Sequence, residues 1–392
     1  MLSLHKLFLN DGSPESFDRR IAPTDAQRKA LILAKNTIRD HLLKDIQAAT
    51  TTILGMERAV KPKFRSQGSW VYGTCIQGAH QPPQQMDWDF GVYLPVTVWS
   101  ENAPPRAMAK LYFDLVETSL KRLCGEHGWH LDPKTERCVR VHIASWAHID
   151  IPLYAAPEEN FVEVMEKALA SATNQVHYLR EAAALDESVD FGEMPEQFWE
   201  LMEDIHVARR DGTWTPSDPE DVAKWFEDRI LEHGEGGLQL RRLCRYFKAW
   251  RDYHWRDGGG PSSVLIMIIV ARNFSYAPRR EDLALESAAA HLARELAGDV
   301  VELGIGKENF NRMDAADRRL ASERATTLHH ELDKSRHYGP GLRQAAVDNV
   351  RAQFGTRIAN DPALVLNDDS GVVRSTEAKK VAAPFVGASH SG

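Results

Sequence analysis

The segment GSWVYGTCIQGAHQPPQQMDWDFGVY, residues 68–93, carries the pattern that decides the fold. It begins with a Gly-Ser pair, and near its end two carboxylates, Asp87 and Asp89, flank Trp88. Residues two apart on a β-strand point to the same face, so this strand would present both carboxylates together and turn Trp88 into the opposite layer. Like charges held side by side repel each other unless a cation lies between them. The segment therefore predicts a strand that carries a metal site.

A second strand-like segment, AHIDIPLY at residues 147–154, places Asp150 between two isoleucines. A carboxylate in such an apolar alternation is costly to bury without a partner. Three carboxylates on adjacent strands can hold two magnesium ions about 3.5–4 Å apart, one to activate an attacking hydroxyl and one to stabilise the leaving oxygen. We therefore predict that Asp87, Asp89 and Asp150 are the metal ligands and the catalytic residues. Mg²⁺ is the expected cofactor, in two copies, with Mn²⁺ as the substitute.

The Gly-Ser pair supplies a phosphate-binding element to this site. Gly68 lets the backbone approach a phosphate closely, and the Ser69 hydroxyl and neighbouring N–H groups can bind triphosphate oxygens. A turn or a solvated strand edge explains a Gly-Ser pair or an Asp-x-Asp found alone. Gly-Ser, then Asp-x-Asp, then a distant third Asp is the order that resembles the DNA polymerase β-like nucleotidyltransferases.

The rest of the chain predicts flanking helices. Apolar spacing after Thr24-Asp25 indicates a long amphipathic helix, and the pattern then changes to short strands around one helix at residues 107–124. Beyond a turn-rich break at residues 209–221 the pattern is helical again, with a buried helix at residues 264–271. The expected parts are an N-terminal helical segment (1–60), a nucleotidyltransferase core (61–175), a helical domain that completes the active-site cleft (176–345) and a C-terminal segment with a flexible tail (346–392).

Composition limits the partners and the compartment. The formal net charge of −8 over 392 residues argues against a general binder of long nucleic acids, which needs an excess of Lys and Arg. The longest apolar run is far shorter than the roughly 20 residues of a membrane-spanning helix. The cysteines form no CxxC pair and no leader pattern is apparent, so we expect a reduced, cytoplasmic protein. Cys124, His127, His130 and Cys138 fit no standard zinc spacing, and we interpret them as parts of a helix end and a turn.

Four segments of the sequence resemble one family. They are KPKFRSQGSWVYGT (61–74), MDWDFGVYLPV (86–96), HIDIPLYA (148–155) and LQLRRLCRYFKAWRDYHWRDGGGPSSVLIMIIV (238–270). Together they are similar to the bacterial cGAS/DncV-like nucleotidyltransferases of CBASS antiphage defence, in their DncV-like branch. The resemblance implies an α+β fold in which a polymerase β-like nucleotidyltransferase core with a mixed β-sheet is fused to an oligoadenylate-synthetase-like helical domain.

The resemblance also implies roles for individual residues. It assigns Gln67, Gly68, Ser69 and Tyr72 to a phosphate loop. Lys248 would contact the donor triphosphate, Ser262 would bind phosphate and Arg140 would contact a base. Asn309, beside Asn311 and Arg312, would lie near the acceptor nucleotide. A cation in an aromatic helical segment and a hydroxyl at a helix N-terminus both suit phosphate. Without the resemblance, a surface lysine and an ordinary helix cap explain Lys248 and Ser262 equally well.

The function that this reading favours is a second-messenger synthase that joins ATP and GTP, by analogy into a cyclic GMP-AMP. Its partners would be an effector protein that binds the product, and conjugating or regulatory operon proteins at the C-terminus, where Gly392 suits conjugation. An ordinary disordered end is the alternative explanation of this tail. Activation by duplex DNA and membrane binding are not expected. Two alternatives use the same residues: a template-independent nucleotidyltransferase acting on RNA or a small molecule, and a nucleotide-binding sensor without cyclase activity.

Overall fold

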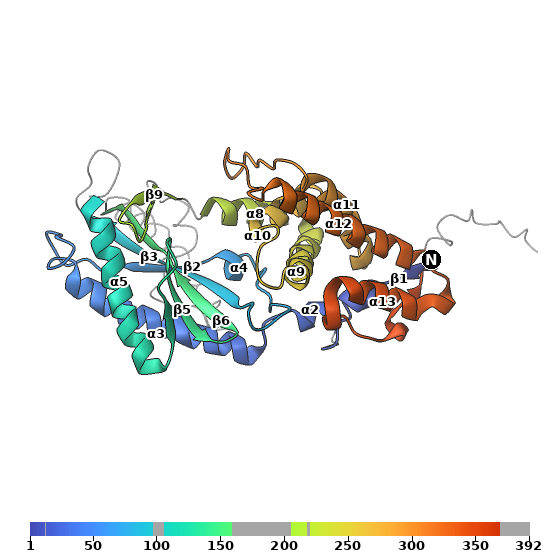
Figure 1. Ribbon diagram of the computed structural model, residues 1–392, viewed down its shortest axis with the longest axis horizontal. Helices are drawn as coiled ribbons and strands as arrows, with labels where there is room; N and C mark the ends of the chain where they lie inside the picture. The colour runs from blue at the N-terminus through green and yellow to red at the C-terminus, as the bar shows by residue number, and fades with distance from the viewer. Residues whose placement is uncertain (12, 97–105, 159–204, 218–219, 369–392) are drawn as a thin grey trace, which may run out of the picture.

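The computed structural model describes residues 1–11, 13–96, 106–158, 205–217 and 220–368, and these form two lobes (Figure 1). We call residues 25–75, 86–96, 106–158 and 205–217 the sheet lobe, and residues 1–11, 13–21 and 220–368 the helical lobe. Each lobe has its own cluster of buried apolar side chains. The expected α+β architecture, with a mixed sheet beside a helical domain, is confirmed.

The sheet lobe is built around one long strand. Its elements are β2 (Lys63–Gln67), β3 (Met86–Val96), β4 (His130–Asp132), β5 (Val139–Ala144), β6 (Ala147–Ile151), β7 (Leu153–Pro157), β8 (His206–Ala208) and β9 (Trp214–Pro216). The strand order is β4-β5-β6-β3-β7-β8-β9, with β2 antiparallel to β3. Strands β6 and β7 run parallel to successive halves of β3. The central strand β3 thus pairs with β2, β6 and β7 along different stretches of its length.

Two helices cover the apolar face of this sheet: α3 (Asp25–Ala49) and α5 (Arg106–His127). The first helix begins where the sequence predicts, because Thr24 accepts a hydrogen bond from the Gln27 backbone and the Gln27 side chain bonds back to Thr24. Trp88 is buried in the same core, on the face opposite the carboxylates. The alternation of Asp87, Trp88 and Asp89 across the strand is therefore as predicted.

The helical lobe packs around one buried helix. Its larger elements are α8 (Glu220–Glu232), α9 (Gly237–His254), α10 (Ser263–Arg272), α11 (Glu281–Glu295), α12 (Ala315–Arg336) and α13 (Arg343–Phe354). Its short elements are β1 (Leu2–Ser3), α1 (His5–Phe8), α2 (Phe17–Arg20), the 3-10 turns η1 (Gly234–Gly236), η2 (Pro340–Leu342), η3 (Gly355–Arg357) and η4 (Pro362–Leu364), and β10 (Leu366–Asn367). The run Leu265–Ala271 in α10 is buried, as the sequence predicts.

The boundary expected at residue 60 does not coincide with the lobes, and the one expected at residue 175 lies outside the described residues. Residues 2–8 and 17–21 contribute to the core of the helical lobe, where Phe8 and Phe17 pack against Tyr246 with ring centroids 5.7 and 5.4 Å apart. Residues 206–216, placed by sequence in the helical domain, form β8 and β9 of the sheet. Strands of three residues are too short for an alternating pattern, so their type depends on long-range pairing.

The C-terminal boundary at residue 345 is also displaced, because α13 packs against α9 and α12 as part of the helical lobe. The expected flexible tail, including Gly392, lies outside the described residues.

A segment that we call the strap, residues 76–85, joins the lobes between α4 (Gly68–Val71) and β3. The Gln77 amide donates to the Ile21 carbonyl over 2.8 Å. At the other end, the Gln84 side chain donates to the carbonyls of Asp252 and Trp255 at 2.6 and 3.0 Å. The strap therefore ties the start of β3 to the C-terminal end of α9.

Candidate active site

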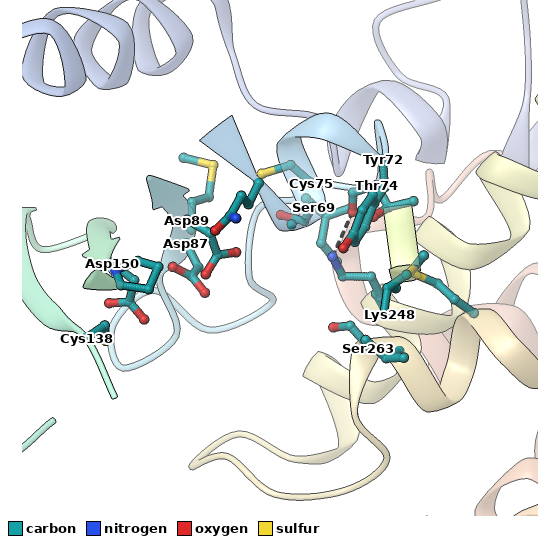
Figure 2. A pocket seen from close by; sticks show the side chains of 18 of the residues that line it. Ser69, Tyr72, Thr74, Cys75, Asp87, Asp89, Cys138, Asp150, Lys248 and Ser263 are labelled. Atoms are coloured by element: carbon teal, nitrogen blue, oxygen red, sulfur yellow. Dashed lines mark hydrogen bonds between the residues drawn. The ribbon is translucent and has the colours of Figure 1, made fainter. Parts of the chain in front are cut away.

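A cavity of about 590 Å³ lies between the lobes and receives most of the predicted site residues. The sheet lobe contributes the three carboxylates and the Gly-Ser loop, and the helical lobe contributes Lys248 and Ser263 (Figure 2). The cleft expected between the two parts of the chain is therefore present.

The three carboxylates meet because β3 and β6 run parallel and in register. Asp89 lies opposite Asp150, and Asp87 lies opposite His148. All four side chains consequently share one face of the sheet. Burial, followed by the charges of Asp87 and Asp150, raises the pKa of Asp89 to about 8. Without a bound cation the carboxylates repel one another, and the fold holds them together despite this repulsion.

Asp150 has a cationic partner that the sequence did not indicate. Arg140 lies opposite it on β5, and the guanidinium donates two hydrogen bonds to the carboxylate, Nε to Oδ1 at 2.6 Å and Nη2 to Oδ2 at 2.7 Å. The pair raises the pKa of Arg140, mainly through this hydrogen bonding. The resemblance implied a base contact for Arg140. In the structure, Nε and Nη2 of Arg140 both donate to the Asp150 carboxylate.

The Gly-Ser loop contacts β3 directly. Strand β2 ends at Gln67 and α4 begins at Gly68, whose φ is +67°. A Cβ atom at Gly68 would lie 2.0 Å from Oδ2 of Asp89, so any side chain there would force the Asp89 carboxylate to move. Ser69 and Tyr72 line the same cavity, as a phosphate loop requires.

Gln67 also lines the cavity, but its side chain is engaged within the sheet lobe. Its Nε2 donates to the Tyr93 hydroxyl at 2.6 Å, and its Oε1 accepts from the Tyr154 hydroxyl at 3.3 Å. This residue therefore holds the two stacked tyrosines below the loop.

Lys248 approaches from α9 at the opposite wall. Its Nζ donates to the Thr74 carbonyl at 2.8 Å, and the residue is 5% exposed (Figure 2). Burial is the main cause that lowers its pKa below the usual lysine value. A cation held here faces the carboxylates across the space that a triphosphate would need.

Ser262 was predicted as a phosphate ligand, but the adjacent serine faces the cavity. Ser262 is the N-cap of α10, where its Oγ accepts from the Leu265 amide at 3.2 Å, and it lines a different hollow of about 710 Å³. Ser263 lines the cavity with the carboxylates and accepts from Arg251 at 3.0 Å. Two serines follow Pro261 directly, and the sequence does not indicate which one caps the helix and which one faces the cavity.

Asn309 does not line the cavity of the carboxylates. Its Oδ1 accepts from the amides of Val300 and Asn311, and its Nδ2 donates to Asp299 at 2.7 Å. These bonds build a local turn. Arg312 lines the hollow beside Ser262. The acceptor-nucleotide role of Asn309, with Asn311 and Arg312, remains a prediction.

The donor set fits a divalent cation. Single ligand atoms of Asp87, His148 and Asp150 all lie within 4.8 Å of one another. In the described part of the chain, Oδ1 of Asp87 and Nε2 of His148 are buried without a hydrogen-bond partner. Sequence reasoning missed His148, although its signal was present: the H-x-D spacing puts His148 and Asp150 on the same face of one strand.

The described helices include none whose length and apolar content would allow it to cross a membrane.

Comparison with known proteins gives matches to both lobes. The family described as the DncV-like nucleotidyltransferase domain of cyclic GMP-AMP synthases matches residues 62–154, and the C-terminal domain of those synthases matches residues 237–367. The cyclic GMP-AMP synthase of Vibrio cholerae is 36% identical over 250 residues, which cover 61% of this chain and 54% of that protein. One from Escherichia coli is 35% identical over 215 residues, 54% of this chain and 47% of that protein. The chain thus spans about half the length of the curated relatives it matches.

Solved structures agree on the fold. Vibrio cholerae DncV in complex with the linear intermediate 5′ pppA(3′,5′)pG superposes with a TM-score of 0.69 at 23% identity, covering 93% of this chain and 98% of that one. Escherichia coli DncV with bound 3′-deoxy GTP gives a TM-score of 0.70 at 21% identity, over 93% and 99% of the two chains. With matches to both of its lobes, the chain belongs to the DncV-like nucleotidyltransferases.

Proposed function

We propose that this protein is a cyclic dinucleotide synthase that joins ATP and GTP, with release of pyrophosphate, into a cyclic GMP-AMP. One observation carries the proposal: three carboxylates in strand register face a Gly-Ser loop and a buried lysine across one cavity. The relatives support the choice of substrates, because the matched Vibrio cholerae structures include complexes with ATP and GTP and with a linear intermediate.

Asp87, Asp89 and Asp150 would hold Mg²⁺, or Mn²⁺ in its place. A bound divalent ion supplies two things here: a lower pKa for the attacking ribose hydroxyl and neutralisation of the leaving pyrophosphate. Asp89, whose pKa is raised to about 8, would lose its proton when the cation binds.

The remaining residues position the triphosphate. Charge builds on the α-phosphoryl oxygens in the transition state, so fixed donors around them lower the barrier. The Ser69 hydroxyl and the amides of the Gly-Ser loop would bind phosphate oxygens, and Lys248 would neutralise charge from the opposite wall. Asp150, oriented by Arg140, would accept the proton of the attacking hydroxyl. Cyclisation repeats the same transfer with the linear dinucleotide as substrate.

Mass spectrometry of the products tests this proposal. Purified protein with ATP, GTP and MgCl₂ should yield the mass of a cyclic dinucleotide, and EDTA should abolish it. The double variant Asp87→Asn/Asp89→Asn should form no product, whereas Asp132→Asn, on β4 outside the cavity, should remain active. A linear product, or nucleotide transfer to added RNA instead, would contradict the cyclase assignment and support the template-independent alternative. Binding of nucleotide without turnover would identify a sensor.

We also propose that the product acts on a separate effector protein, in antiphage signalling, as in CBASS systems. Adding the effector to the reaction and assaying its activation would test this step. Product that leaves the effector inactive would contradict it.

A further inference from the structure

His148 lies inside the carboxylate cluster. It is two residues before Asp150 on β6, opposite Asp87 on β3, and it is 8% exposed. Its Nε2 lies 3.2 Å from Oδ1 of Asp87 and 3.9 Å from Oδ1 of Asp150. The imidazole therefore approaches two of the proposed metal ligands at once.

Gln85 fixes which nitrogen of this imidazole carries hydrogen. The Nε2 of Gln85 donates to the carbonyls of Ala144 and Ser145 at 3.4 and 3.1 Å. Its Oε1 is thereby turned toward Nδ1 of His148 at 3.0 Å and Nδ1 of His142 at 2.9 Å. An amide oxygen can only accept, so both Nδ1 atoms must donate. In neutral His148 the hydrogen is then on Nδ1, and Nε2 presents a lone pair.

That lone pair lies close to a carboxylate oxygen, 3.2 Å away, without the alignment of a hydrogen bond. Nε2 of His148 and Oδ1 of Asp87 are both buried, and neither has a hydrogen-bond partner among the described residues. Two acceptors at this distance repel each other, so the arrangement calls for a positive centre between them. Histidines that bind metals usually donate their second ring N–H to a carbonyl or carboxylate group, which orients the ring toward the ion. Gln85 provides that contact here.

We propose that Nε2 of His148 is a direct ligand of a catalytic divalent cation, together with Asp87 and Asp150, and that it gives the site a preference for Mn²⁺ over Mg²⁺. The inference rests on the metal site of the proposed function and adds a nitrogen ligand to it. Mg²⁺ favours all-oxygen ligands, whereas imidazole raises the relative affinity for transition-metal ions.

Two substitutions of His148 distinguish the role of its Nε2 from that of its hydrogen bond to Gln85. His148→Asn keeps an amide donor near the position of Nδ1, able to reach Gln85, but removes Nε2. His148→Gln places a carbonyl oxygen near the position of Nε2. His142→Asn is the matched control, because His142 bonds to the same Gln85 oxygen while its Nε2 lies 3.8 Å from Asp132, on β4.

The measurements use the full chain and Mn²⁺ alone, without nucleotide. Pulsed electron paramagnetic resonance should detect directly coordinated ¹⁴N on bound Mn²⁺ in the unsubstituted protein and in His142→Asn, and none in His148→Asn. The Mn²⁺ dissociation constant should rise about tenfold or more in His148→Asn, with a smaller change for Mg²⁺. His148→Gln should bind Mg²⁺ at least as well relative to Mn²⁺ as the unsubstituted protein does.

Three results would overturn the inference: two concern only the role of His148, and the third concerns the whole metal site. Bound Mn²⁺ without nitrogen coupling would remove His148 from the coordination sphere but leave the carboxylate site intact. Tighter Mn²⁺ binding by His148→Asn would show that the imidazole opposes the ion instead of binding it. Failure of Mn²⁺ to bind the unsubstituted protein at all would overturn the metal assignment of the proposed function itself.

Discussion

Gly68→Ala is expected to disable the site through a single contact. The new Cβ would lie 2.0 Å from Oδ2 of Asp89, against the 3.4 Å at which ordinary contact begins, so the carboxylate must move by about 1.4 Å. A displacement of about 1 Å in a catalytic group costs roughly 100-fold in rate. We therefore expect the initial rate of dinucleotide formation from ATP, GTP and MgCl₂ to fall by about 100-fold.

The substitution also strains the backbone, and a second glycine isolates that effect. Gly128, between α5 and β4, has a φ of +68°, nearly the +67° of Gly68, but a Cβ there would meet nothing within 4 Å. Alanine in this left-handed region costs about 1–2 kcal/mol. Urea unfolding in EDTA should show a loss of that size in Gly128→Ala, whose activity should be unchanged. If Gly68→Ala keeps its activity within threefold of Gly128→Ala, the contact with Asp89 does not constrain the site.

Three other predictions follow from the charges. Arg140→Gln leaves the buried Asp150 without its cation and should destabilise the metal-free protein by about 3 kcal/mol in urea unfolding; an unchanged midpoint would show that the pair contributes nothing net. The raised pKa of Asp89 means that the folded state retains a proton that the unfolded state releases, so metal-free stability should fall as pH rises from about 4 to about 8. Thermal melts in EDTA should show this slope, which Asp89→Asn should flatten; equal slopes would refute it. Long duplex DNA should not raise the rate of dinucleotide synthesis, given the net charge of −8, and strict dependence on DNA would contradict this.

The sequence predicted those parts of the site that depend on local periodicity. Asp87 and Asp89 share a face because they are two apart on one strand, and a buried Asp150 between isoleucines had to face other polar groups. The same rule applied to His148 would have found the fourth member of the cluster. Lys248 was located by its resemblance to a family lysine, and its burial against the Thr74 carbonyl came from the structure.

The sequence could not predict what depends on pairing across distance. Arg140 meets Asp150 only because β5 and β6 pair antiparallel in one particular register, and a shift of one residue would turn the guanidinium to the other face. Ser262 and Ser263 differ only in which of them the helix uses as its cap. Residues 2–8, 17–21 and 206–216 were assigned to the wrong parts because their burial depends on elements far away in the chain.

The strap between the lobes bears on how the sequence of this protein can diverge. At its α9 end it bonds to main-chain oxygens: His80 contacts the carbonyl of Tyr253, and Gln84 donates to those of Asp252, Trp255 and Arg256. Every amino acid carries a backbone carbonyl, so mutation of the residues on the α9 side leaves these acceptors in place as long as the helix ends where it does. Drift can therefore change the side chains around the cleft entrance, and with them substrate choice, while the two lobes keep the same mutual alignment.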